Sequence, residues 1–158
     1  MIRELSFATR LGRVRLGWTA EGICLLRFAE APGPDEAATA PAWVQEAVRR
    51  LLAHLNGRPQ DLCDLPVDLS GLTPFQRRVA EVLRATRPGQ TLTYGDVALL
   101  AGRPGAARAV GQAVKTNPVL VLVPCHRVVA ATGPGGWSAF GTPERKARLL
   151  ALERPTAG

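Results

Sequence analysis

Residues 73–118, TPFQRRVAEVLRATRPGQTLTYGDVALLAGRPGAARAVGQAVKTNP, contain three short helical patterns separated by turn residues. The first pattern begins with a capping threonine, Thr73, followed by proline at the first helical position and by Gln76 three residues after the cap. A second helix is expected over 93–100 and a third over 106–116. Three short helices within about 45 residues are typical of a helix-turn-helix DNA-binding unit, although small domains that never bind DNA also have this outline.

An unbroken apolar run, 119–123, follows this unit and leads directly into Pro124, Cys125 and His126. The run predicts a buried strand or extended segment. Cys125 is a candidate nucleophile, because an ordinary thiol has a pKa of about 8.5 and needs a basic neighbour to ionise at neutral pH. Adjacent residues of an extended chain point opposite ways, so His126 can help only if the chain turns or a water bridges them. A third group would have to orient the imidazole, and a Cys-His pair alone is more often structural.

The first part of the chain predicts a small lobe of strands and one helix. Residues 5–28 show short apolar alternation with turn signals at Leu11-Gly12 and Glu21-Gly22, which favours two or three antiparallel strands. Residues 31–41 are rich in Pro, Gly and Ala and predict a surface loop. Apolar residues from Trp43 to Leu55 recur at helical spacing, and residues 58–72 predict a connector.

A last helix is expected from Thr142 through Leu152. Together these patterns predict an α+β protein. We expect an N-terminal lobe of an antiparallel sheet and a helix, with its connector, over 1–70. A C-terminal helical domain over 71–158 would carry the helix-turn-helix motif and the cysteine.

Composition narrows the function classes. The 158-residue chain is 46% hydrophobic and carries a formal charge of +7, most of it from arginine, which suits contacts with phosphates. A generally basic surface would give the same charge. Three widely spaced cysteines, Cys24, Cys63 and Cys125, indicate neither a disulfide framework nor a zinc site. No run reaches the roughly 18 apolar residues of a membrane helix, and we expect a soluble cytoplasmic protein.

The motif PCHRVV at 124–129, preceded by Asn117-Pro118 and by Arg-Ala-Val-Gly at 108–111, resembles the O6-alkylguanine-DNA alkyltransferase family. The resemblance extends over the second domain, from Phe75-Gln76 through Tyr94-Gly95 to Leu-Leu-Ala-Leu-Glu at 149–153. It implies direct repair of DNA: the alkyl group on O6 of a guanine is moved to the protein's own cysteine, once per molecule.

The resemblance also assigns roles to the reacting groups. Cys125 matches the alkyl acceptor, and His126 matches the histidine that acts on it through a bound water. Glu153 matches the glutamate that orients this histidine, although a solvent-facing helix end is the alternative. Tyr94 matches a tyrosine that accompanies base flipping and donates a hydrogen bond to the departing purine. Asn117 matches a hinge between the DNA reader and the cysteine segment, and it could also serve as a helix cap.

The family flips the damaged base out of the duplex, because a stacked guanine cannot present its O6 substituent to a thiol. Arg108 matches the arginine that fills the vacated space from the minor groove; an ordinary exposed arginine is the alternative. Gly111 costs a helix roughly 1 kcal/mol relative to alanine, which makes sense if another backbone passes close by. With Ala109, Thr93 and Tyr94, these residues form the expected DNA-binding set.

The loop before the last helix departs from the family pattern. Many relatives carry a tyrosine in a glycine-rich stretch there, whereas this chain has Trp137 followed by Ser138. We expect Val128, Trp137 and Ser138 to line the guanine pocket. The bulkier loop leaves the size of the accepted alkyl group open, and O4-alkylthymine is a second candidate substrate.

The proposed chemistry requires no metal and no organic cofactor. A thioether product is not reversed by cellular thiols, so the protein should be consumed stoichiometrically. The expected partner is double-stranded DNA with an alkylated guanine, bound by a monomer and without a membrane. Two alternatives stay open: a non-catalytic lesion-binding relative of the family, which the presence of Cys125 argues against, and a cysteine hydrolase, for which the sequence indicates no oxyanion hole.

Overall fold

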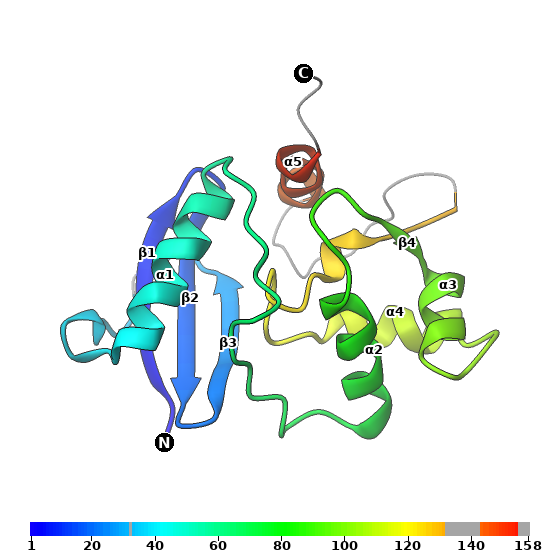
Figure 1. The fold of residues 1–158 in the computed structure, drawn as a ribbon, viewed down its shortest axis with the longest axis horizontal. Coiled ribbons are helices and arrows are strands. Elements are labelled where there is room, and N and C mark those ends of the chain that lie inside the picture. Colours follow the sequence, from blue (N-terminus) through cyan, green and yellow to red (C-terminus); the bar gives the residue numbers. More distant parts are fainter. Residues whose placement is uncertain (32, 132–142, 155–158) are drawn as a thin grey trace.

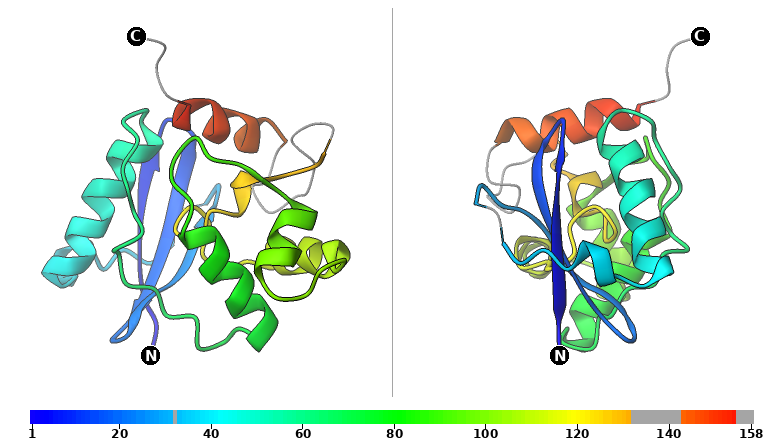
Figure 2. Two further views of the ribbon diagram at one scale, coloured as in Figure 1. Left: turned by 45° about the vertical axis from the view of Figure 1, so that its right-hand side comes forward. Right: turned by 90° about the vertical axis from the view of Figure 1, so that its left-hand side faces the viewer.

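A computed structural model describes residues 1–31, 33–131 and 143–154. The protein is an α+β fold in which a three-stranded sheet and helix α1 lie at one end of the molecule and helices α2, α3 and α4 at the other (Figure 1). Helix α5 crosses above both parts (Figure 2). One cluster of buried apolar side chains includes residues from both ends of the chain. The domain boundary at 70/71 stays a prediction.

The sheet consists of β1 (Arg3–Thr9), β2 (Gly12–Thr19) and β3 (Gly22–Phe28), antiparallel in that order, as the alternation predicted. Gly22 joins β2 to β3 with φ of 153°. A Cβ there would come within 2.8 Å of the backbone of Pro66 and Val67. Glycine is needed for both reasons. The connector is therefore pinned against β3, where the N–H of Ile23 donates to the carbonyl of Pro66 over 2.9 Å.

Helix α1 (Ala42–Leu55) packs against the sheet through the apolar face that its spacing predicted. The buried residues on this face are Val44, Ala47, Leu51, His54 and Leu55. A short 3-10 helix, η1 (Ala37–Thr39), lies in the segment expected to be only a loop. Four apolar side chains and one histidine thus form the inner face of α1.

The second half contains the expected helical unit: α2 (Pro74–Arg84), α3 (Tyr94–Leu100) and α4 (Ala107–Lys115). Capping boxes begin the first two. Thr73 accepts from the N–H of Gln76, and Thr93 accepts from the N–H of Asp96. A pair of two-residue strands was not predicted: β4 (Leu92–Thr93) lies parallel to β5 (Val128–Val129). This pairing joins the start of α3 to the segment that follows Cys125.

The apolar run 119–123 is buried as predicted, but the expectation of an extended strand was wrong. Val119 forms a single bridge to Leu26 of β3, and the chain then turns back so that Leu120 bridges Val123. Val121 has φ of 71°, a left-handed conformation that is costly for a β-branched residue. The surrounding packing holds this turn, which leads into the 3-10 helix η2 (Cys125–Arg127).

Helix α5 (Pro143–Glu153) packs against η2 and buries Leu149 completely. Its last residue, Glu153, is also buried. Among the described residues, no helix combines the length and the apolar character that crossing a bilayer requires.

Candidate active site

The predicted nucleophile, Cys125, is fully buried at the first residue of η2. Its backbone N–H donates to the carbonyl of Val123 over 2.7 Å, so the chain turns tightly as it reaches the cysteine. The condition set by the sequence, a turn at the Cys-His pair, is therefore met. His126 is fully buried in the same turn.

Asn117 links the end of α4 to the cysteine segment. Its Nδ2 donates to the carbonyl of Val123 over 2.9 Å, and its Oδ1 accepts from the N–H of Val119 over 3.0 Å. A further side-chain hydrogen bond joins Asn117 and Cys125. Asn117 thus holds the two ends of the buried turn together, at the position of the predicted hinge.

Burial raises the pKa of Cys125 from 9.0 to about 12. The hydrogen bond from Asn117 and the positive charge of Lys146 act in the opposite direction but do not offset the loss of solvation. The free protein therefore holds Cys125 as a neutral thiol at pH 7. Any reaction at this sulfur needs a base that removes the proton as the substrate enters.

The Glu153 carboxylate is the centre of a buried network in which it accepts four N–H groups. Oε1 lies 2.9 Å from Nε2 of His126 and 3.0 Å from Nε of Arg127. Oε2 lies 2.8 Å from Nε2 of His54 and 2.9 Å from Nη2 of Arg127. Burial would raise the pKa of Glu153, but the hydrogen bonds from His126, His54 and Arg127 bring it well below its usual value. The structure therefore brings His126 into contact with Glu153, whose carboxylate is ionised.

Contact with this carboxylate sets the tautomer of His126. A carboxylate accepts hydrogen bonds and does not donate them, so Nε2 of His126 carries the proton and Nδ1 is the basic nitrogen of the ring. Burial lowers the pKa of His126, and the hydrogen bond and charge of Glu153 offset this only in part. The ring is neutral at pH 7 and can accept a proton at Nδ1.

Two buried residues of this network were not assigned a role by the sequence. Arg127 directs Nη1 to Thr86, whose carbonyl oxygen lies at 3.0 Å and hydroxyl oxygen at 2.9 Å. His54 lies on α1 and contacts Glu153, although the two residues are 99 positions apart in the sequence. One signal for His54 was available, since it shares the apolar face of its predicted helix with Leu51 and Leu55.

Lys146 places a buried amine near the cysteine. Its Nζ donates to the carbonyl of Val128 over 2.9 Å, and the residue is 3% exposed. Desolvation lowers the pKa of Lys146 to about 8, while Cys125 raises it. The N–H of Val128 donates to the carbonyl of Cys125. We expected the backbone of Val128 to read the guanine. Its N–H already donates within the chain, whereas its carbonyl, which accepts from Lys146, has a second lone pair.

Tyr94 approaches the cysteine because the β4–β5 pair aligns Thr93 with Val129. Burial raises the pKa of Tyr94, and so does its proximity to Cys125. Thr93 is half-buried, and its hydroxyl caps α3 by accepting from the N–H of Asp96 over 3.1 Å. The structure thus brings Tyr94 close to Cys125 and uses the Thr93 side chain as a helix cap.

The predicted DNA-binding residues of α4 lie away from the buried network. Arg108 is exposed, Ala109 and Gly111 are partly exposed, and Val110 faces the core. Within the described chain nothing lies within 4 Å of a Cβ placed on Gly111. The described part of the chain therefore does not supply the close backbone that the sequence led us to expect at Gly111.

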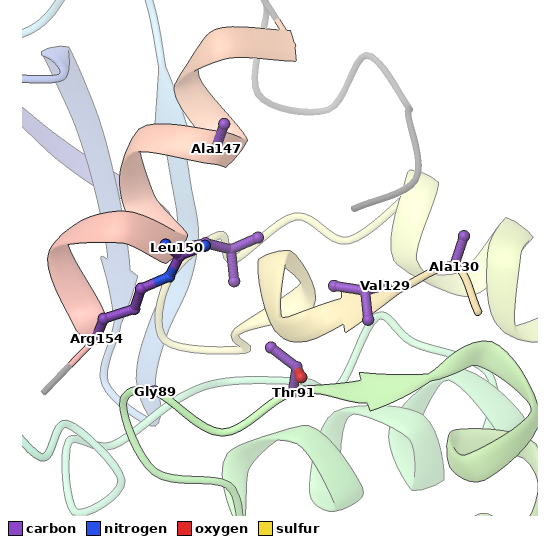
Figure 3. Close-up of a pocket in the computed structure, with 7 residues that line it drawn as sticks. All are labelled: Gly89, Thr91, Val129, Ala130, Ala147, Leu150 and Arg154. Atoms are coloured by element: carbon purple, nitrogen blue, oxygen red, sulfur yellow. The ribbon is translucent and has the colours of Figure 1, made fainter. Parts of the chain in front are cut away.

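A hollow of about 360 Å³ lies between α5, the β5 strand and the loop before β4 (Figure 3). Its lining residues are Gly89, Thr91, Val129, Ala130, Ala147, Leu150 and Arg154. None of the network residues lines it. Trp137 and Ser138, predicted for the guanine pocket, lie outside the described residues.

Known proteins match this chain in sequence and in fold. Residues 74–155 match the family model of the 6-O-methylguanine DNA methyltransferase, DNA binding domain. A methylated-DNA--protein-cysteine methyltransferase of Mycolicibacterium paratuberculosis is 46% identical over 108 residues, which make up 68% of this chain and 64% of that protein. The match thus spans less than two thirds of this relative's length.

Solved structures match over more of the chain. The crystal structure of Mycobacterium tuberculosis O6-methylguanine methyltransferase has a TM-score of 0.79 and 33% identity, covering 100% of this chain and 97% of that one. The structure of Mycobacterium tuberculosis OGT in complex with DNA has a TM-score of 0.79 and 32% identity, covering 96% and 92% of the two chains.

Proposed function

Because the chain belongs to the 6-O-methylguanine DNA methyltransferase family, we propose that it repairs DNA by moving the alkyl group from O6 of a guanine to Sγ of Cys125. The observation that carries this proposal is the buried turn η2, which holds Cys125 next to His126, pairs His126 with Glu153, and packs against α2 of the helix-turn-helix unit. O4-alkylthymine is a second candidate substrate. The expected place of action, the cytoplasm, belongs to the same proposal.

The transfer is a displacement at the alkyl carbon. The S–C bond forms as the C–O6 bond breaks, and the electron pair of that bond stays on the guanine. The thiol proton passes to Nδ1 of His126, and the family resemblance implies that a bound water carries it. A proton is returned to the guanine, which is the leaving group and becomes an unmodified base. Atoms and charge balance without a cofactor, and the thioether consumes the protein.

Electrostatics account for a cysteine that stays protonated in the resting protein and ionises during the proposed transfer. With a pKa of about 12, only a fraction on the order of 10⁻⁵ of Cys125 is thiolate at pH 7. Proton transfer to His126 creates an imidazolium beside the Glu153 carboxylate, which stabilises it. The nearby ammonium of Lys146 stabilises the thiolate. These charges favour the ionised pair at the moment of attack rather than in the resting protein.

The proposed partner is double-stranded DNA, bound by a monomer through α3 and α4. The similarity to a protein solved in complex with DNA supports this. Arg108 is exposed on α4, where it can enter the duplex and replace the flipped base. Gly111, which has open space beside it, allows the DNA backbone to approach. Affinity should fall with salt and depend little on sequence.

The mass of the intact protein tests the proposal directly. The protein is incubated with duplex DNA containing O6-methylguanine, with Cys125→Ala as the control. One added methyl group per molecule, absent from the control, is expected. Selective binding of the lesion without a mass change would indicate a non-catalytic lesion-binding protein, and turnover of small esters or amides would indicate a cysteine hydrolase.

A further inference from the structure

His54 is a buried titratable residue that the proposed chemistry does not use. It lies on α1 in the N-terminal half, is 0% exposed, and places Nε2 2.8 Å from Oε2 of Glu153. The two residues are 99 positions apart in the sequence. His54 is therefore a direct polar contact between the first lobe and the network that holds His126.

A second hydrogen bond sets the tautomer of His54. Its Nδ1 accepts from the backbone N–H of Gln60 over 2.9 Å. Because this nitrogen is an acceptor, the proton of a neutral ring lies on Nε2 and points at Glu153. His54 is held from both ends: the segment after α1 orients the ring, and the ring donates to the carboxylate.

The four donors divide evenly between the two oxygens of Glu153. Oε1 receives His126 and one nitrogen of Arg127, while Oε2 receives His54 and the other nitrogen. Each oxygen has two acceptor directions, so the carboxylate is saturated. Without His54, Oε2 would have a free acceptor direction in a buried site, and the carboxylate would be more basic and less firmly oriented.

We infer that His54 is a positioning residue for alkyl transfer: by donating to Oε2 of Glu153 it keeps Oε1 directed at His126, so the N-terminal lobe contributes to the acceptor site. This inference rests on the proposed function for its rate effect. Its structural part concerns only the two histidines and Glu153. His54 (α1), His126 and Arg127 (η2) are the charged or titratable groups that face Glu153 in the described structure.

The first test does not depend on DNA. The chain has only two histidines, so the ring nitrogens of His54 and His126 can be resolved by NMR of ¹⁵N-labelled protein. Both rings are expected with the proton on Nε2. In His54→Leu, the Nε2 proton of His126 should exchange faster with water and the pKa of His126 should shift. A proton on Nδ1 of His54 in the wild type, or unchanged His126 signals in the variant, would overturn the inference.

The second test compares methyl transfer from O6-methylguanine DNA in three variants. His54→Leu removes the donor and should slow the transfer step about tenfold or more, with lesion affinity unchanged. His54→Gln keeps an N–H donor and should recover most of the rate. Leu55→Ala, a matched change on the same buried face, should lower the melting temperature and leave the rate of folded protein within about threefold.

The outcomes separate the two ideas. If the wild type does not transfer the methyl group but His54→Leu perturbs His126, the proposed function fails and the positioning contact stands. If the wild type transfers and all three variants lose rate in proportion to their lost stability, His54 is merely structural. Equal rates in His54→Leu and the wild type would also reject the inference.

Discussion

Replacing Glu153 with glutamine should destabilise the protein strongly at neutral pH. The carboxylate accepts four N–H groups at 2.8 to 3.0 Å. Glutamine has one oxygen and one NH₂ group, so two of these donors would face another donor. Arg127, only 5% exposed, would keep a buried positive charge without its counter-charge.

The magnitude follows from the buried ion pair. Removing one partner of such a pair costs about 3–5 kcal/mol, a large part of the roughly 5–15 kcal/mol that stabilises a typical domain. For a chain of this size each kcal/mol shifts the melting temperature by about 2–4 °C, so Glu153→Gln should melt roughly 6–20 °C lower. Urea unfolding followed by circular dichroism at pH 7 measures the difference in the free energy of unfolding, and a thermal scan measures the shift in melting temperature.

The same difference should depend on pH with a defined sign. The pKa of Glu153 is lower in the folded protein than its ordinary value of 4.5. Its stabilising contribution is therefore complete above about pH 4.5 and is lost as the pH falls below that value. Glutamine does not titrate, so the stability gap between wild type and variant should narrow from pH 5 to about pH 3.

A double variant checks the cause. Adding Arg127→Met to Glu153→Gln removes the uncompensated charge and should recover part of the lost stability. A cost below about 1 kcal/mol at pH 7, a gap that stays constant down to about pH 3, or a double variant less stable than Glu153→Gln would refute the reasoning.

Three further predictions concern the turn and the helix that surround the site. Burial raises the pKa of Cys125 from 9.0 to about 12, so folding favours the neutral thiol and stability should fall above pH 9 by up to about 1.4 kcal/mol per pH unit. Urea unfolding of wild type against Cys125→Ala measures this, and parallel curves would contradict it. Asn117→Ala removes the hydrogen bonds of the turn and should cost about 1–3 kcal/mol while raising the pKa of Cys125 further, which a titration of thiolate absorbance reports. Thr73→Ala removes the capping box of α2 and should cost about 1 kcal/mol in thermal melts without changing methyl transfer, so a loss of transfer would argue against a purely local role.

The sequence predicted the elements that depend on local physics. The glycine turns of the sheet, the apolar face of α1 and the capping box at Thr73 each involve residues a few positions apart. Such interactions leave a readable period or a fixed spacing. The family motif added Cys125, His126 and Glu153, although their roles in transfer stay proposals.

The sequence was wrong where the path of the chain depended on packing. The run 119–123 consists of apolar residues, and apolar character predicts burial but not direction. In the structure the run turns at Val121, whose left-handed conformation no local propensity favours. Its surroundings hold it: β3 on one side and Asn117 across the turn.

By itself, the sequence determined the type and order of the main elements and the presence of a cysteine beside a histidine after a buried apolar run. Only the tertiary structure decided that Glu153 is shared by His126, Arg127 and His54, which come from α1 and η2. A hydrogen bond across 99 positions leaves no periodic trace in the chain. It exists because packing places α1 and the end of α5 in one buried space, where the carboxylate must be paired and its donors are selected by distance.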